Sequence, residues 1–261
     1  MTPFSLHRPD TVEQALAAFA GDAAWLAGGH TLIPAMKSRL RQVERLVDLS
    51  KLHALEGIEH MGDSLLVGAM ARHVSVATSP VVKAAIPGLA LLAGGIGDPQ
   101  VRNKGTLGGS IANNDPAADY PAALLALNAL VDTSRGTHAA DDYFQGMFTT
   151  ALEDGELITA VRFAVPLAFH YAKIRHPASR YALAGVAVAR FADGHRVGVT
   201  GATSGALRWT QAEAALNSGG ALPAVLVHDD LAADIHASAQ YRAHLAGVML
   251  KQALAAIGSA G

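Results

Sequence analysis

Residues 94–121 read GGIGDPQVRNKGTLGGSIANNDPAADYP, and the rest of the chain is best understood around this stretch. It is rich in glycine, carries few large side chains and ends where a new helix is expected to begin. Because glycine has no Cβ, backbone of this kind can come close to a bound molecule. We therefore expect the segment to wrap around a ligand rather than to fill a core, and the candidate ligand is a dinucleotide.

This stretch contains one of two glycine turns. The first glycine turn is AGGHT at 27–31, which follows an apolar run and precedes a helix expected at 32–40. The second glycine turn is TLGGS at 106–110. A strand–turn–helix junction directs backbone N–H groups and the positive end of a helix dipole at what lies before it, which suits phosphate. Neither turn matches the GxGxxG or P-loop patterns. On spacing alone, a pyrophosphate cradle and ordinary structural turns both remain open.

Composition excludes several classes of protein. The 261 residues are 51% hydrophobic and 16% charged, which is typical of a well-packed globular protein. A net charge of -2 gives no field that would attract nucleic acid or an anionic membrane. No apolar stretch is long enough to span a membrane, and the N-terminus lacks the pattern of a signal peptide. The expectation is a soluble, cytoplasmic protein.

Cysteine is absent, which excludes disulfides, iron–sulfur ligation and cysteine nucleophiles in this chain. The 12 histidines are scattered and include no HExxH motif. We therefore expect no metal site here, and any metal or cluster chemistry must come from another chain.

Apolar periodicity indicates a mixed α+β chain that divides at Pro166. Before this residue, helices are expected at 11–19, 32–40, 73–78, 81–93 (interrupted by Pro87-Gly88) and 119–130, and strands at 45–49, 64–68 and 156–165. The region 132–146 is expected to form loops with one brief strand or turn. After Pro166, strands at 169–175, 182–191 and 196–202 precede helices at 211–217 and 241–257. The predicted domains are 1–165 and a small α+β unit at 166–261.

Three segments carry a family resemblance: AGGHTLIPAMK at 27–37, GDPQVRNKGTLGGSIANNDPAADYPAALLAL at 97–127, and SAQYRAHLAGVMLKQAL at 238–254. Together they resemble the FAD-binding medium subunit of molybdenum hydroxylases, of the carbon monoxide dehydrogenase medium-subunit type within the xanthine dehydrogenase family. The similarity runs from Phe4 to Ile257. It implies a FAD-binding domain of the vanillyl-alcohol-oxidase (PCMH) type with two α/β lobes, roughly 1–54 and 55–165. The C-terminal domain would then carry an antiparallel sheet and helices.

The resemblance also implies which residues bind FAD. Both glycine turns would hold the pyrophosphate, Asn113 would face the flavin's polar chain, and Asp119 would bond to a ribityl or ribose hydroxyl. Ile96 and Tyr181 would lie against the isoalloxazine ring. The full set is Ala27, Gly28, Gly29, His30, Thr31, Ile96, Thr106, Leu107, Gly108, Gly109, Ser110, Asn113, Asp119, Lys173 and Tyr181.

Simpler roles compete with some of these assignments. Asp119 could cap the helix that follows it, Tyr181 could be a core aromatic, and Lys173 could be a surface lysine. His30 is expected to contribute loop hydrogen bonds, and no residue of this chain is expected to be catalytic. Two regions, 130–147 and 215–237, are shorter than in many relatives, so the adenine end and the C-terminal rim are expected to differ.

The implied function is electron transfer within a complex. A large molybdopterin subunit would oxidise the substrate, and two [2Fe–2S] clusters on a small subunit would feed FAD here, which reduces an external acceptor. The assembly would be a heterotrimer or a dimer of heterotrimers. Carbon monoxide, an N-heterocycle, an aldehyde and an aromatic thioester all remain open as substrates. The alternatives are a stand-alone flavin oxidoreductase of the same fold, similar to peptidoglycan-precursor reductases, and a non-redox nucleotide-binding module.

Overall fold

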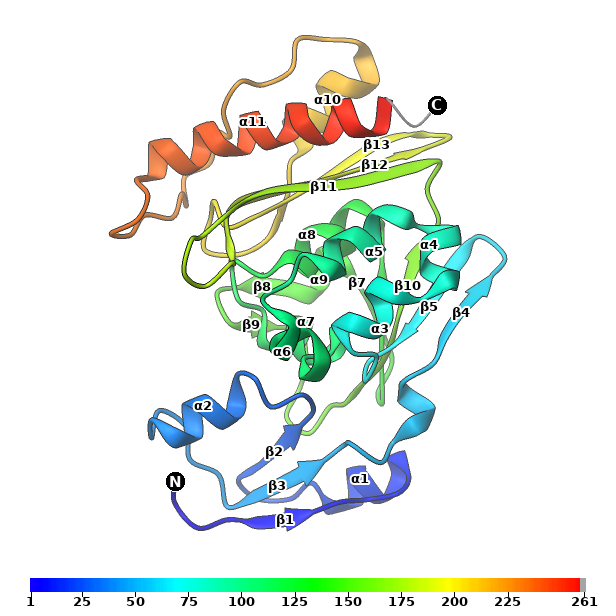
Figure 1. Cartoon of the computed structure of the whole chain (residues 1–261), viewed down its shortest axis with the longest axis vertical. Helices are drawn as coiled ribbons and strands as arrows, with labels where there is room; N and C mark the ends of the chain where they lie inside the picture. Colours follow the sequence, from blue (N-terminus) through cyan, green and yellow to red (C-terminus); the bar gives the residue numbers. More distant parts are fainter. Residues whose placement is uncertain (259–261) are drawn as a thin grey trace.

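The computed structural model describes residues 1–258, and its sheets stack along the long axis of the molecule (Figure 1). The N-terminal part is a 3-stranded parallel sheet of order β1–β3–β2. Its elements are β1 (Ser5–His7), α1 (Val12–Ala18), β2 (Ala23–Leu26), α2 (Leu32–Lys37), β3 (Arg45–Asp48) and the short 3-10 helix η1 (His53–Leu55). Helix α2 ends before the expected residue 40, because Arg39 adopts φ 63.

The middle part is a 5-stranded antiparallel sheet of order β4–β5–β10–β6–β7. Its strands are β4 (Ile58–Met61), β5 (Ser64–Gly68), β6 (Leu130–Thr133), β7 (Thr137–Ala139) and β10 (Ile158–Ala164). The helices are α3 (His73–Thr78), α4 (Pro80–Ala85), α5 (Pro87–Gly94), α6 (Pro99–Lys104), α7 (Leu107–Asn113), α8 (Asp119–Ala126) and α9 (Ala140–Tyr143). Leu65, Leu107 and Phe163, each with no exposed surface, lie in the core between this sheet and the helices.

The glycine-rich segment is more regular than expected. Residues 99–104 and 107–113 form α6 and α7, with Asp98 and Thr106 as N-caps whose side chains accept from Val101 N and Gly109 N. The segment therefore contributes two capped helices as well as the loops between them. The region 132–146 also contains more structure than the single brief strand expected: part of β6, then β7, α9 and β8 (Phe144–Gly146), which pairs with β9 (Thr149–Thr150).

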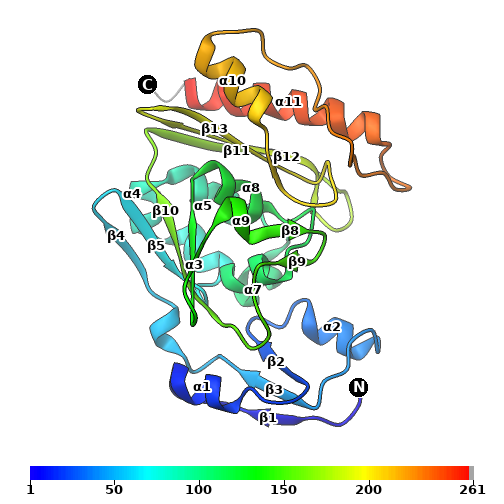
Figure 2. The same ribbon diagram turned by 180° about the vertical axis from the view of Figure 1, so that it is seen from behind.

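The C-terminal part is a 4-stranded antiparallel sheet of order β11–β12–β13–β14. Its elements are β11 (Ala168–Arg175), β12 (Ala182–Phe191), β13 (Gly194–Thr200), β14 (Leu207–Arg208), α10 (Thr210–Ser218) and α11 (Ala239–Gly258). Helix α11 crosses the outer face, and α8 of the middle part packs on the inner face (Figure 2). Gly198 makes this contact close, since a Cβ there would lie 2.1 Å from the Ala122 carbonyl oxygen.

Candidate functional site

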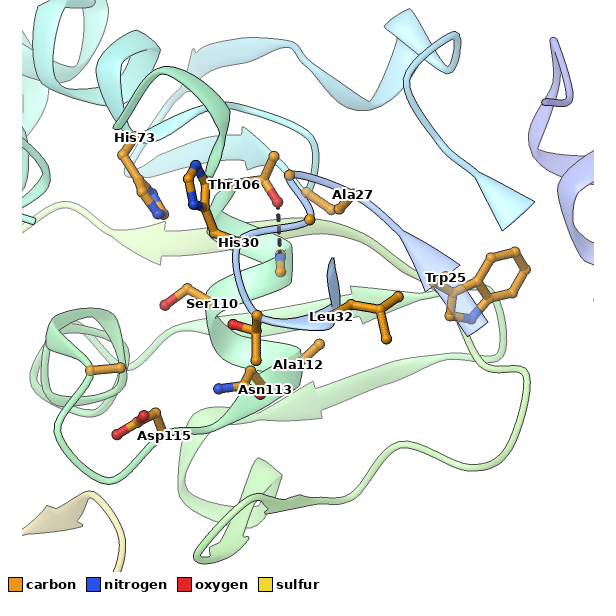
Figure 3. A pocket seen from close by; sticks show the side chains of 18 of the residues that line it. Trp25, Ala27, His30, Leu32, His73, Thr106, Ser110, Ala112, Asn113 and Asp115 are labelled. Carbon is orange, nitrogen blue, oxygen red and sulfur yellow. Dashed lines mark hydrogen bonds between the residues drawn. The ribbon is translucent and has the colours of Figure 1, made fainter. Parts of the chain in front are cut away.

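A cavity of about 660 Å³ opens between the parts, in the range of volumes that small-molecule and cofactor sites occupy. Both glycine turns line it, together with residues 179–181 of the C-terminal part (Figure 3 shows the turns). Of the residues that the sequence singled out, the following line the cavity: Ala27, Gly28, Gly29, His30, Thr31, Ile96, Thr106, Gly108, Gly109, Ser110, Asn113, Asp119 and Tyr181. One cavity thus unites positions more than 150 residues apart in the chain.

Two of the expected residues lie elsewhere. Leu107 has no exposed surface and packs in the core of the middle part. The Lys173 side chain is 6% exposed and its Nζ donates to Asp119 and to the Arg180 carbonyl oxygen. Lys173 is therefore a buried partner of the site rather than a surface lysine or part of the cavity lining.

The first glycine turn presents free backbone N–H groups. Within residues 1–258, the N–H groups of residues 28–32 have no hydrogen-bond acceptor. Gly29 has φ 71, a conformation that favours glycine, and Gly28 packs so closely that a Cβ would lie 2.1 Å from the Lys104 carbonyl oxygen. Thr31 caps α2 without a side-chain hydrogen bond, which leaves its hydroxyl available. A row of unpaired N–H groups on a cavity wall is suited to an anion.

The second glycine turn differs, because its backbone donors are already used. Leu107 N donates to Ala71 O at 3.0 Å, and Gly108 N to Ala69 O at 2.9 Å. Gly109 N donates to the Thr106 hydroxyl at 3.1 Å, the dashed line in Figure 3. What this turn offers a ligand is mainly side chains along one helix, those of Ser110 and Asn113.

Asp119 lies at the centre of a buried network. One carboxylate oxygen accepts from the Tyr171 hydroxyl at 2.6 Å and the other from Lys173 Nζ at 2.5 Å. Burial raises the pKa of Asp119, while Lys173 and Tyr171 act against that rise. Each oxygen keeps a second lone pair for a ligand hydroxyl. Asp119 does not cap α8, because the N-cap is Ala118 and no side-chain hydrogen bond caps this helix.

The structure adds cavity residues that sequence reasoning missed. Asp115 lines the cavity beside Asn113, accepts from Ala117 N at 2.9 Å, and has a pKa raised by burial. It stands in the same DPAAD run as Asp119, so the run itself was a usable signal. His73 lies beside His30 (Figure 3), and no local pattern marks it.

His73 is 4% exposed, and its Nδ1 has no hydrogen-bond partner within residues 1–258. Burial lowers its pKa from 6.5 to about 4, with smaller contributions from His30 and Arg102. The ring packs against Tyr120, with centroids 5.5 Å apart. The cavity wall therefore carries a neutral imidazole at physiological pH.

A neutral buried histidine makes stability sensitive to acid. Because the folded pKa of His73 lies below its unfolded value of 6.5, stability is lost as pH falls from 6.5 towards 4. We expect this group to account for a loss of about 3 kcal/mol across that range. We call the fall in the free energy of unfolding as pH drops below 6.5 the acid limb. Measured by urea unfolding, the acid limb of His73→Phe should be correspondingly flatter than that of the unaltered chain. His53→Phe, at a side chain that is 78% exposed, should leave the limb unchanged. An unchanged limb in His73→Phe would contradict this assignment.

Residues 1–258 contain no group of three or more His, Cys, Asp or Glu side chains arranged to hold a metal ion. No helix in the same described range is long and apolar enough to cross a membrane. The fold and the cavity define a class: mixed α+β proteins whose cavity, lined by two glycine turns, is suited to an anionic ligand.

Comparison with known proteins identifies the family within this class. Residues 2–167 match the family described as "FAD binding domain in molybdopterin dehydrogenase". The carbon monoxide dehydrogenase medium chain of Hydrogenophaga pseudoflava is 35% identical, covering 96% of each chain. The nicotine 6-hydroxylase medium subunit of Paenarthrobacter nicotinovorans is 34% identical, covering 91% of this chain and 90% of that subunit.

Solved structures agree with the sequence comparison. The structure of carbon monoxide dehydrogenase from Hydrogenophaga pseudoflava that lacks the Mo-pyranopterin moiety of the molybdenum cofactor superposes with a TM-score of 0.89, covering 99% of each chain. Quinoline 2-oxidoreductase from Pseudomonas putida 86 also gives 0.89, at 26% identity and covering 99% of this chain and 98% of that one. The chain therefore belongs to the FAD-binding medium subunits of molybdenum hydroxylases, of the carbon monoxide dehydrogenase medium-chain type. The family resemblance and the mixed α+β fold expected from the sequence are confirmed.

Proposed function

We propose that this chain holds FAD in the cavity between the two glycine turns and relays electrons through it. The electrons would come from two [2Fe–2S] clusters on a small partner subunit and leave to an external acceptor. A molybdopterin cofactor on a large subunit would oxidise the substrate, in a heterotrimer or a dimer of heterotrimers. When bound, the flavin supplies the redox chemistry, and this chain supplies binding and orientation.

The unpaired N–H groups of residues 28–32 carry the proposal. A pyrophosphate is anionic and accepts hydrogen bonds from several directions, so it fits a row of backbone donors for which residues 1–258 supply no acceptor. Ser110 and Asn113 on α7, which also line the cavity, would bond to the same polar chain. The remaining lone pairs of Asp119 would accept a ribityl or ribose hydroxyl. The donors and acceptors present thus fit the polar part of FAD.

The isoalloxazine ring would lie towards Ile96 and Tyr181. Tyr181 is 43% exposed and lines the cavity, which favours a role beside the ring over the alternative of a core aromatic. Burial raises the pKa of its hydroxyl, so the side chain stays neutral. A neutral aromatic face is a suitable neighbour for a planar ring.

The subtype of the fold and the domain limits belong to the same proposal. The vanillyl-alcohol-oxidase type predicts two lobes, 1–54 and 55–165, and a C-terminal domain at 166–261. The grouping of strands supports these limits, because each range contains its own main sheet: β1–β3–β2 in the first lobe, β4–β5–β10–β6–β7 in the second, and β11–β12–β13–β14 in the C-terminal domain. The small β8–β9 pair is an additional sheet within the second lobe.

The test is to isolate the chain from its native cells under mild conditions together with whatever co-purifies. We expect stoichiometric FAD on acid release, with molybdenum and iron in the same size-exclusion peak. A lone chain that carries FAD without either metal would favour the stand-alone oxidoreductase. No flavin, and none taken up on titration with FAD, would overturn the proposal in favour of a non-redox module.

A further inference from the structure

The segment at 176–181, between β11 and β12, forms one side of the cavity. We call it the wall turn. Its residues Ser179, Arg180 and Tyr181 line the cavity. Its geometry depends on hydrogen bonds more than on packing, because residues 177–181 are exposed and Arg180 adopts φ 64. A non-glycine residue in this conformation persists only when its surroundings hold it there.

His176 supplies most of the bonds that hold the wall turn. Its ring Nδ1 accepts from Ala178 N at 3.2 Å and from Ser179 N at 3.1 Å. Its own backbone N donates to Tyr181 O at 2.7 Å, and its carbonyl oxygen accepts from Arg180 N at 2.9 Å. An imidazole nitrogen that accepts two N–H groups carries no proton, so this geometry requires His176 without a proton on Nδ1.

A second histidine lies against the first. The His236 ring meets the His176 ring edge-on, with centroids 4.3 Å apart and planes at 84°. His236 is fixed through its backbone, since its N donates to Asp234 Oδ1 at 2.9 Å. Asp234 is held in turn by Arg242 at 2.6 Å. Hydrogen bonding from the His236 backbone lowers the pKa of Asp234 to about 2, so this carboxylate stays ionised at moderate pH.

We propose that His176 is a positioning residue for the flavin site: without a proton on Nδ1 it helps to hold the wall turn against the cavity, and a proton there weakens that hold. The inference rests on the proposed function. A proton on Nδ1 replaces the acceptor of two N–H groups with a third donor, so both bonds are lost together. A charge on both rings would add repulsion at 4.3 Å. Other ionisable groups near the turn are Asp115, Asp119, Lys173, Arg175, Arg180, Tyr181, Asp234 and Arg242.

Two substitutions separate this role from a merely structural one. In His176→Asn, the side-chain oxygen can accept from the same N–H groups two and three residues on, and it does not titrate. In His176→Leu, no acceptor exists at any pH. His236→Phe keeps an edge-on ring without a second charge. His53→Asn is the matched control, at a side chain that is 78% exposed.

The readouts are the rate of FAD release from the native complex and the amide hydrogen exchange of residues 177–181, corrected for intrinsic pH dependence. In the unaltered protein, both should rise by about tenfold between pH 8 and pH 5.5, as expected for the loss of two ordinary hydrogen bonds. In His176→Asn, FAD release and hydrogen exchange should both be slow at both pH values. In His176→Leu, both should be fast at both pH values. His236→Phe should reduce the rise, and His53→Asn should keep it.

A His176→Asn protein with the same pH dependence as the unaltered one would overturn the inference, as would a His176→Leu protein that stays slow at pH 8. The two proposals fail differently. If neither the unaltered protein nor any of the variants binds FAD at pH 8, the proposed function is wrong, yet the hydrogen exchange of residues 177–181 still tests the role of His176. If FAD binds but neither readout depends on residue 176, only the role of His176 is wrong.

Discussion

Replacing Gly28 with alanine is expected to weaken FAD binding by about 5- to 150-fold, the equivalent of an overpacking cost of roughly 1–3 kcal/mol. The added Cβ would lie 2.1 Å from Lys104 O, 2.7 Å from Lys104 C and 2.8 Å from Gly105 Cα. All three are backbone atoms, so no side chain can rotate away. The first glycine turn must therefore separate from the end of α6, and the two walls of the cavity no longer meet.

The measurement is a fluorescence titration of apo chain with FAD, alongside a thermal melt. Gly136→Ala is the matched control, because it adds the same methyl group where nothing lies within 4 Å and φ is not positive. Its affinity should equal that of the unaltered chain. Gly108→Ala is less informative, since its Cβ would lie 2.7 Å from Ala69 Cβ and would disturb the core as well. Unchanged affinity in a folded Gly28→Ala chain would contradict the cradle.

These glycines show what sequence can and cannot specify. The sequence marks positions where a Cβ is not tolerated, but it does not say which neighbour excludes the Cβ. At Gly28 and Gly108 the nearest atoms belong to the protein itself, at Lys104 and Ala69. Because they lack a Cβ, both glycines allow two segments of the chain to pack closely beside the cavity, and they shape the site indirectly. Their contribution to the cavity was predictable, and the packing partners were not.

The same limit applies to the regular structure. Strands 64–68 and 182–191 were predictable to the residue because they are apolar runs flanked by polar turns. Helices α6 and α7 were not predicted, since each spans fewer than eight residues and contains glycine or asparagine, which have low helix propensity. Their capping by Asp98 and Thr106, and the burial of α7, compensate.

Site residues follow a similar division. The cavity positions carried by the family motifs were predictable from the family resemblance, whereas the spacing of the two glycine turns alone left ordinary structural turns open. His73 was missed, since its contacts with His30 and Tyr120 join residues that lie more than 40 positions apart. Lys173 was identified, but its contact with Asp119 depends on how α8 packs against the C-terminal sheet, of which β11 is an edge strand. Tertiary contacts of this kind leave no periodic signal in a single sequence.

Lys173→Met is expected to destabilise the protein by about 3–5 kcal/mol, the usual effect of removing one partner from a buried ion pair. The two side chains are 6% and 5% exposed, so the Asp119 carboxylate would remain buried beside Tyr171 without its counter-charge. The wall turn would also lose the bond from Lys173 Nζ to Arg180 O at 3.1 Å. Both effects should also speed FAD release. Urea unfolding at pH 8 measures the loss of stability.

The pH dependence and a matched control identify the cause. Without Lys173, burial raises the folded pKa of Asp119 further above its unfolded value. A raised carboxyl pKa favours folding at low pH and opposes it as pH rises, so the loss in Lys173→Met should be smaller at pH 5 than at pH 8. Lys51→Met removes an ion pair with side chains 49% and 69% exposed, and should cost no more than about 1 kcal/mol. Equal losses for Lys173→Met and Lys51→Met would show that Asp119 does not depend on its buried partner.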